Sequence, residues 1–224
     1  MVRDEGLVIA IDGPAGAGKS TVAKKVADIL EYIYIDTGAM YRALTLKALK
    51  QGLNLTNKEE VAAMAKDSEV KFKKVNEKER VILDGEDVTD KIRTNKVSNN
   101  VSLVAKIKAV RERLVKLQRK MAAQGGIVMD GRDIGTVVLP NADVKVFLTA
   151  TVEERAERRY KDLADQGEEV EFEALKEEII KRDETDRNRD VSPLKQAEDA
   201  YEIDTTELSI SEVIDKIIDL CWEE

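Results

Sequence analysis

Residues 13–20 read Gly-Pro-Ala-Gly-Ala-Gly-Lys-Ser and fit the pattern G-x-x-x-x-G-K-[ST] at every position. The glycines allow the backbone to turn tightly, so that successive N–H groups can point inward at phosphate oxygens. The start of the following helix adds the positive end of its dipole at the same place. Lys19 can reach the outer phosphates of a nucleotide, and the Ser20 hydroxyl can ligate Mg²⁺. This stretch therefore predicts a loop that binds phosphate.

The sequence on either side of this loop predicts an α/β fold. Short apolar stretches suited to strands alternate with helical stripes of apolar residues. The strand candidates are residues 7–11, 32–35, 127–129, 144–148 and 201–203. The helix candidates are residues 19–30, 40–49, 107–121 and 210–221. Continuous apolar strands between helices are typical of a parallel sheet that is buried on both faces.

Two stretches interrupt this alternation. Residues 69–94 place short apolar runs among polar residues, which predicts a small antiparallel insertion in the α/β frame. Residues 160–181 are acidic and contain few large apolar side chains. We interpret this second stretch as a mobile helical flap.

Two helix starts carry the pattern of a capping box. Ser209 is followed by Glu212, and Thr56 is followed by Glu59. In each pair the hydroxyl can accept from the backbone N–H of the glutamate, and the glutamate carboxylate can accept from the backbone N–H of the N-cap residue. The pattern predicts that helices begin after Ser209 and after Thr56.

The composition excludes several classes of protein. The chain has 224 residues, of which 42% are apolar, enough for a substantial core. It has no histidine and one cysteine, Cys221, which excludes a Ser-His-Asp triad, a histidine–metal site, an internal disulfide and a thiolate zinc cage. The formal charge of −8 argues against a general nucleic-acid-binding role. No apolar run approaches a membrane span and no signal peptide is evident, so we expect a soluble, cytoplasmic protein.

A phosphate-binding loop alone does not name a reaction. The D-x-x-G motif of GTPases is absent, and residues 95–98 have Ser98 where the base-reading motif N-K-x-D needs an aspartate. The chain is also too short for a motor or a helicase with its coupling domains. These observations favour phosphoryl transfer between small molecules.

Clustered arginines indicate a second substrate that carries phosphate. On one predicted helix, Arg155, Arg158 and Arg159 share a face. On a second predicted helix, Arg182, Asp186 and Arg189 share a face. The two sets frame the flap, which could close over phosphates, exclude water and bring positive charge to a transferring group. The alternative interpretation is a solvated pair of helices joined by salt bridges.

Three further residues follow predicted strands. Arg42 comes shortly after the strand at 32–35, and Asp130 and Arg132 come directly after the strand at 127–129. Ligands of open parallel sheets bind beyond the carboxyl ends of the strands, so both arginines are expected at the same edge as the phosphate-binding loop. Asp130 is placed to assist Mg²⁺ through water, with a turn-capping role as the alternative.

Five blocks of sequence occur together in a fixed order. They are Gly-Pro-Ala-Gly-Ala-Gly-Lys-Ser-Thr (13–21), Asp-Thr-Gly-Ala-Met-Tyr-Arg (36–42), Ile-Arg-Thr (92–94), Asp-Gly-Arg-Asp-Ile-Gly-Thr-Val-Val (130–138) and Arg-Asp-Glu-Thr-Asp-Arg-Asn-Arg (182–189). In this combination the chain resembles the bacterial-type cytidylate kinases. The resemblance implies a P-loop fold with a five-stranded parallel sheet and helices on both faces. It also implies a single domain over residues 1–224, with an antiparallel nucleoside-monophosphate-binding insertion at about 38–104 and a helical lid at about 156–190.

The resemblance further implies transfer of a phosphoryl group from ATP to CMP or dCMP, assisted by Mg²⁺. The residues expected at ATP are Gly13, Pro14, Ala15, Gly16, Ala17, Gly18, Lys19, Ser20, Thr21 and Arg158. The expected catalytic residues are Lys19, Arg132, Arg158 and Arg189. Mg²⁺ is expected at Ser20 and, through water, at Asp130.

The acceptor nucleotide is assigned three groups of residues by the same resemblance. Its phosphate is expected at Thr37, Tyr41, Arg42 and Arg132, with Arg189 reaching toward the phosphates. Its base is expected at Ser102, Arg111 and Asp133. Its sugar is expected at Arg182 and Asp186. A carboxylate such as Asp133 suits cytosine because it accepts from the N4 amine, whereas O4 of uracil would repel it.

Two alternatives compete with this interpretation. One is another small-molecule P-loop kinase that acts on UMP or a different acceptor, and the other is a nucleotide-sensing protein that transfers nothing. The expected partners are ATP and CMP or dCMP, with no nucleic acid and no membrane. We expect the chain to be a monomer.

Overall fold

The computed structural model describes residues 6–76, 78–165, 167 and 170–222, and it consists of two compact units. Unit 1 comprises residues 1–34 and 122–224, and unit 2 comprises residues 35–121. A hydrophobic core lies within each unit, and the units are described one at a time. The division into one domain with an insertion and a lid, which the resemblance implies, stays a prediction.

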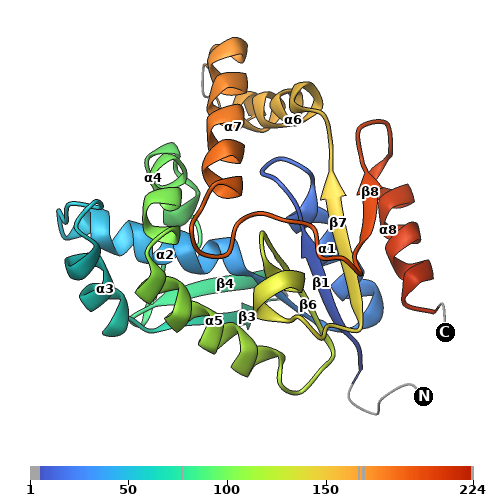
Figure 1. The fold of residues 1–224 in the computed structure, drawn as a ribbon, viewed down its shortest axis with the longest axis horizontal. Helices are drawn as coiled ribbons and strands as arrows, with labels where there is room; N and C mark the ends of the chain where they lie inside the picture. The colour runs from blue at the N-terminus through green and yellow to red at the C-terminus, as the bar shows by residue number, and fades with distance from the viewer. Residues whose placement is uncertain (1–5, 77, 166, 168–169, 223–224) are drawn as a thin grey trace. The chain divides into compact units, whose positions relative to one another are not determined.

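A five-stranded sheet has the strand order β2-β6-β1-β7-β8 (Figure 1). Its strands are β1 (Val8–Asp12), β2 (Ile33–Asp36), β6 (Ile127–Gly131), β7 (Val144–Thr149) and β8 (Tyr201–Asp204). β1 runs parallel to both of its neighbours, with Val8 opposite Ile127 and Ile9 opposite Val144. β7 runs parallel to β8. All five predicted strands form, and the predicted α/β class is confirmed.

Two helices of unit 1 pack together over the core of the sheet, α1 (Lys19–Leu30) and α8 (Ile210–Leu220). The buried side chains that join them to the sheet include Ile9, Ile11, Val22, Val26, Val128, Val146, Ile214 and Ile217. α8 begins with the predicted capping box, because Ser209 and Glu212 bond reciprocally. In the part of the chain that the structure describes, no helix is both long enough and apolar enough to cross a bilayer.

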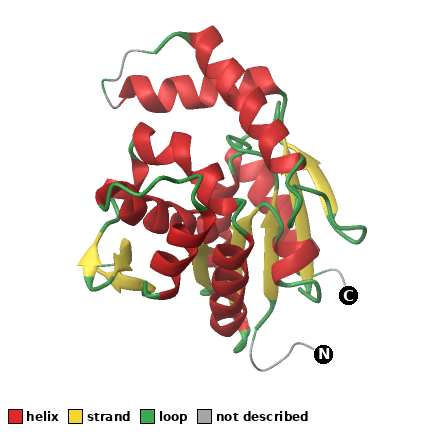
Figure 2. Cartoon of the chain, turned by 60° about the vertical axis from the view of Figure 1, so that its left-hand side comes forward, coloured by secondary structure: helices red, strands yellow, loops and turns green. Residues whose placement is uncertain are grey.

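The predicted flap is a hairpin of two helices, α6 (Val152–Asp165) and α7 (Phe172–Arg187), which lie side by side in both views (Figures 1 and 2). They share a small apolar cluster of Ala156, Leu163, Leu175 and Ile179. The Tyr160 ring also meets the Phe172 ring edge-on, with centroids 6.0 Å apart. The helical part of the prediction is confirmed.

One prediction about α7 is wrong. Arg189 does not share a helix face with Arg182 and Asp186, because α7 ends at Arg187. Asn188 has φ −93° and ψ 14° and leaves the helical path, so Arg189 extends from the segment that follows.

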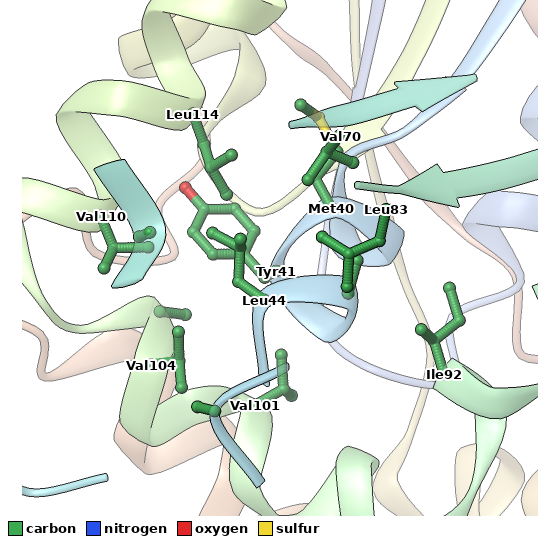
Figure 3. Close-up of a cluster of buried hydrophobic side chains, with 14 of the residues drawn as sticks. Met40, Tyr41, Leu44, Val70, Leu83, Ile92, Val101, Val104, Val110 and Leu114 are labelled. Carbon is green, nitrogen blue, oxygen red and sulfur yellow. The ribbon is translucent and has the colours of Figure 1, made fainter. Parts of the chain in front are cut away.

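Unit 2 combines four helices with a three-stranded antiparallel sheet. The strands β3 (Val70–Val75), β4 (Lys78–Leu83) and β5 (Glu86–Asp87) pair in that order, which confirms the antiparallel insertion predicted at 69–94. The helices are α2 (Thr37–Lys50), α3 (Lys58–Lys66), α4 (Asn95–Ala105) and α5 (Lys108–Ala122), with a 3₁₀ turn, η1 (Lys91–Arg93), before α4. Side chains from the helices and from the sheet meet in one core, where Met40, Leu44 and Leu114 are fully buried (Figure 3).

The start of α3 differs from the predicted capping box. Asn57 is the N-cap, and its side chain accepts from the backbone N–H of Glu60. The Thr56 hydroxyl donates instead to Asn54 Oδ1 at 2.8 Å. The pairing of Thr56 with Glu59 is therefore wrong, because asparagine, a preferred N-cap residue, stands at the next position.

Candidate active site

Two glycines in the loop between β1 and α1 lie where a side chain would crowd a neighbouring element. Gly13 has φ 145°, and a Cβ there would lie 1.9 Å from the carbonyl oxygen of Leu148. Gly16 has φ 80°, and a Cβ there would lie 3.0 Å from the Cβ of Arg155. The loop can therefore approach β7 and α6 closely only because these positions lack side chains.

Lys19, the first residue of α1, is buried, and its ammonium donates to the carbonyl oxygen of Pro14 at 2.6 Å. Burial lowers the pKa of Lys19 well below its ordinary value, and the nearby Arg132 guanidinium lowers it further. The carboxylates of Asp130 and Asp12 oppose that shift. Positive groups thus gather beside the glycine-rich loop, where a bound phosphate would stabilise their charge.

Ser20 and Asp130 place two oxygen donors next to each other. The Ser20 hydroxyl donates to Asp130 Oδ2 at 2.9 Å, and the Tyr34 hydroxyl donates to Asp130 Oδ1 at 2.8 Å. Among the residues that the structure describes, no group of three or more histidine, cysteine or acidic side chains could hold a metal ion. Mg²⁺ commonly takes one or two protein oxygens and completes its shell with water and substrate phosphates. The Ser20–Asp130 pair fits Mg²⁺ that arrives with a nucleotide.

An arginine cluster surrounds Asp186 on α7. Arg132, which directly follows β6, contacts it with Nε 3.0 Å from Oδ2, and Nη1 of Arg189 lies 4.0 Å from Oδ1. Asp186 is buried, which by itself would raise its pKa. Arg132, Arg189 and Arg182 nevertheless hold the pKa of Asp186 below its ordinary value. The structure therefore brings these four residues, all predicted at the acceptor, into one charged cluster.

Arg158 on α6 is directed at the β8–α8 connection. Its guanidinium donates to the hydroxyl and the carbonyl oxygen of Thr205, at 3.0 and 2.6 Å, and its Nε pairs with Glu154 at 2.8 Å. A Cβ placed on Gly18 would lie 3.8 Å from Arg158 Nη1. Arg158 thus lies beside the loop predicted to hold ATP, and Thr205 is a neighbour that the sequence analysis missed.

Arg155 joins three parts of unit 1. It is buried, and its guanidinium donates to the carbonyl oxygens of Ala150 and Ala15, each at 3.0 Å. Its Nη2 also lies 2.7 Å from Asp183 Oδ2 on α7, and that aspartate is buried as well. Arg155 therefore forms a salt bridge between the two helices, as in the alternative interpretation, but the pair is buried and not solvated.

Asp133 is buried directly after Arg132, at the start of a short π-helical segment, η2 (Ile134–Val138). The side chain of Asp133 makes no cap hydrogen bond to that segment. Asp12, at the end of β1, accepts from the first two backbone N–H groups instead. The sequence analysis missed this role of Asp12, and its position directly before Gly13 was the only available signal.

Unit 2 carries the other predicted acceptor residues. Asp36 accepts from the backbone N–H of Ala39 at the start of α2, and its other oxygen pairs with Arg42 at 2.7 Å. The Arg111 guanidinium lies 5.4 Å from the centre of the Tyr41 ring. Two more residues predicted at the acceptor also belong to unit 2. They are the buried Thr37 on α2 and the partly buried Ser102 on α4.

A protein-family model described as "Cytidylate kinase" matches residues 9–223, which is nearly the whole chain. The chain belongs to the cytidylate kinase family. It is 56% identical over 213 residues to the cytidylate kinase of Bacillus subtilis, covering 95% of each chain. It is 56% identical over 215 residues to that of Anoxybacillus flavithermus and 54% identical over 220 residues to that of Bacillus cytotoxicus, covering 96% and 98% of each chain.

One solved structure shares the fold at low sequence identity. An uncharacterized protein from Eubacterium ventriosum aligns with a TM-score of 0.53 and 14% identity, over 97% of this chain and 99% of its own. Membership of the cytidylate kinase family makes the chain an enzyme, a nucleoside monophosphate kinase that transfers a phosphoryl group. The predicted family is therefore confirmed.

Proposed function

We propose that this enzyme transfers the γ-phosphoryl group of ATP to CMP or dCMP, giving ADP and CDP or dCDP. The observation that carries the proposal is the charge around the glycine-rich loop, where a buried lysine, Lys19, lies close to Arg132 and Arg182. Asp130 and Asp12 offset this positive charge only in part, since the pKa of Lys19 stays lowered, and the transferring phosphate supplies a further anion. The names of the relatives supply the acceptor, cytidylate.

The donor side of the proposal uses the loop and its neighbours. Backbone N–H groups within residues 13–21, where Pro14 alone has none, cradle the β- and γ-phosphates of ATP. Ser20 directly, and Asp130 through water, would hold Mg²⁺, which neutralises phosphate charge when it is bound. Arg158 lies near Gly18 and is available to the donor phosphates once it leaves Thr205.

The acceptor side divides between phosphate, base and sugar. The phosphate contacts are Thr37, Tyr41, Arg42 and Arg132, and the sugar contacts are Arg182 and Asp186. Ser102 and Arg111 donate to the ring acceptors of cytosine, and the Asp133 carboxylate accepts from its N4 amine. Uracil presents O4 at that point and is disfavoured, because an acceptor then faces an acceptor.

Transfer itself depends on position and charge. Lys19, Arg132, Arg158 and Arg189 stabilise the negative charge of the transferring group. The attacking oxygen of a nucleoside monophosphate is already ionised, so no general base is required. We include in this proposal the insertion at about 38–104 and a lid at about 156–190 that excludes water when it closes. One chain carries every residue assigned a role, so we propose a monomer.

A coupled assay of ADP release tests the acceptor. CMP, dCMP, UMP, AMP and shikimate are offered in turn with ATP and Mg²⁺, and CMP or dCMP is expected to give the highest kcat/KM. A higher value with any other acceptor would favour a different small-molecule kinase. Binding of both ATP and CMP without formation of CDP would favour a sensing protein.

A further inference from the structure

Asp12 bridges two backbone segments that lie far apart in the sequence. It ends β1 and immediately precedes Gly13 of the phosphate-binding loop. Its Oδ1 accepts from the backbone N–H of Ile134 at 2.8 Å, and its Oδ2 accepts from the N–H of Gly135 at 2.7 Å. Each oxygen therefore has its own donor, and the carboxylate clamps the first turn of η2.

This clamp replaces the usual cap of a helical turn. An aspartate at an N-cap commonly accepts from the N–H groups that follow it, and Asp133 occupies that position before η2. The Asp133 side chain makes no such bond. Asp12 already accepts from the Gly135 N–H, one of the donors that an N-cap side chain usually takes, so the Asp133 carboxylate is not needed for that bond.

The packing around the clamp is tight. Asp12 lies opposite Gly131 in the register of β1 and β6, so it also adjoins the residue before Arg132. A Cβ on Gly135 would lie 3.2 Å from Lys145 Cδ and 3.5 Å from Asp12 Oδ2. The segment from Gly131 to Gly135 is thus held from both ends, and Arg132 and Asp133 lie between them.

An ionisable group at this position is costly to bury. Asp12 is almost fully buried, and burial raises its pKa to about 7 even though two N–H groups favour its charged form. An apolar residue would avoid that cost but would leave two buried N–H groups without acceptors. A carboxylate at position 12 is therefore explained by the two hydrogen bonds with which it fixes the turn at Ile134 and Gly135.

The geometry points to Asp12 as a positioning residue for the acceptor: its carboxylate fixes the turn that presents Arg132 and Asp133, and thereby sets the affinity and base preference for the nucleoside monophosphate. This inference rests on the proposed function, which assigns those two residues to the acceptor. Asp12 itself is assigned no contact with the reacting atoms or with the substrate.

The Asp12→Asn variant tests the inference. Its amide oxygen can still accept one N–H, but its NH₂ group faces the other donor, so the turn loses one bond and gains a repulsion. We expect KM for CMP to rise about ten-fold or more and the preference for CMP over UMP to fall. KM for ATP should change by a smaller factor, which reflects the loss of the Asp12 charge near Lys19. Equal changes in both KM values with an unaltered base preference would overturn the inference.

Asp143→Asn is the matched control. Asp143 Oδ2 accepts from the backbone N–H of Val8 at 2.8 Å, so the same kind of bond is weakened at the opposite end of β1. This variant should keep the wild-type KM for CMP and the wild-type base preference. A loss of acceptor affinity equal to that of Asp12→Asn would show that any weakening of β1 has this effect, and would overturn the inference.

Two further measurements separate the possible failures. Calorimetric titration with CMP measures acceptor affinity without turnover. If the wild type binds CMP but forms no CDP, the proposed function is contradicted and the role of Asp12 in acceptor binding is not. An Asp12→Asn variant that binds CMP as tightly as wild type contradicts the role of Asp12. If that variant does not fold, hydrogen exchange of the wild type decides, because the Ile134 and Gly135 amides must be strongly protected before CMP is added. Rapid exchange of these amides would contradict a preformed clamp.

Discussion

Lys19 shows how one residue can carry a charge that the folded protein alone stabilises poorly. Its ammonium is buried, its pKa is lowered by burial and then by Arg132, and it donates a hydrogen bond to the carbonyl oxygen of Pro14. The transferring phosphate would become its strongest partner. The residue therefore contributes more to the transition state than to the resting protein.

Lys19→Ala should lower kcat at least about 100-fold, because it removes a buried positive charge from the transferring group. The measurement is the steady-state rate of CDP formation at saturating ATP and CMP. Lys24→Ala, at an exposed lysine on the same helix, is the matched control and should keep the wild-type rate. A Lys19→Ala rate within about three-fold of wild type would contradict the assignment of the loop.

Asp133→Ala should relax base selection. Loss of the carboxylate removes the acceptor for the N4 amine of cytosine and also removes the repulsion of O4 in uracil. We expect the ratio of kcat/KM for CMP to that for UMP to fall about ten-fold or more, with little change in KM for ATP. An unchanged ratio would remove Asp133 from base recognition.

Asp186 should make the free energy of unfolding depend on pH. Burial opposes its charge, but Arg132, Arg189 and Arg182 hold its pKa below the ordinary 3.8. A carboxyl group with a lowered folded-state pKa stabilises the fold fully above its unfolded pKa, and that stabilisation is lost as the pH falls through the lowered value. Urea unfolding of wild type and Asp186→Asn should show a constant difference between pH 5 and 7 that shrinks below about pH 3.8. A difference that grows on acidification would contradict the sign.

At the scale of elements, the hairpin of α6 and α7 depends on one buried ion pair in addition to its apolar cluster. Arg155 and Asp183 are both almost fully buried, with Nη2 and Oδ2 2.7 Å apart. The same guanidinium reaches Ala15 in the phosphate-binding loop, so the hairpin and the loop share a partner. Removing either member of such a pair leaves an uncompensated group in a dry environment.

Asp183→Asn should therefore lower the free energy of unfolding by about 3 kcal/mol, as measured by urea denaturation. Glu157→Gln provides the control, because Glu157 pairs with Lys161 at 3.9 Å on the exposed side of the same hairpin. That variant should leave the stability nearly unchanged. Equal losses from both variants would contradict a special contribution of the buried pair.

Local sequence patterns predicted most helices and strands, but they could not predict contacts between residues distant in the sequence. The helix at 19–30 and the capping box at Ser209 follow from neighbouring residues, and both form. The predicted N-cap of α3 was wrong because Thr56 and Asn57 are both acceptable N-cap residues. Only the folded structure shows that Asn57 is the N-cap. Asp12 could not be found locally, since its partners lie 122 and 123 residues away.

In the molecule as a whole, the strand order β2-β6-β1-β7-β8 could not be predicted from the sequence pattern. Apolar strands and helices predicted a parallel sheet, but pairing of β1 with β6 joins residues more than a hundred positions apart. The chain also has a net charge of −8 and yet concentrates Lys19 and several arginines at one place in unit 1. Net charge alone would not have located an anion site, whereas the glycine-rich motif did.

Transfer of a phosphoryl group between two bound nucleotides can be followed by ³¹P NMR of the enzyme incubated with ATP, CMP and Mg²⁺. We expect the signals of the ATP γ-phosphate and of the CMP phosphate to decrease together. The signals of ADP and CDP should rise in equal amounts, with almost no inorganic phosphate. Inorganic phosphate as the main product, or ATP consumption that does not depend on CMP, would contradict transfer between two bound nucleotides.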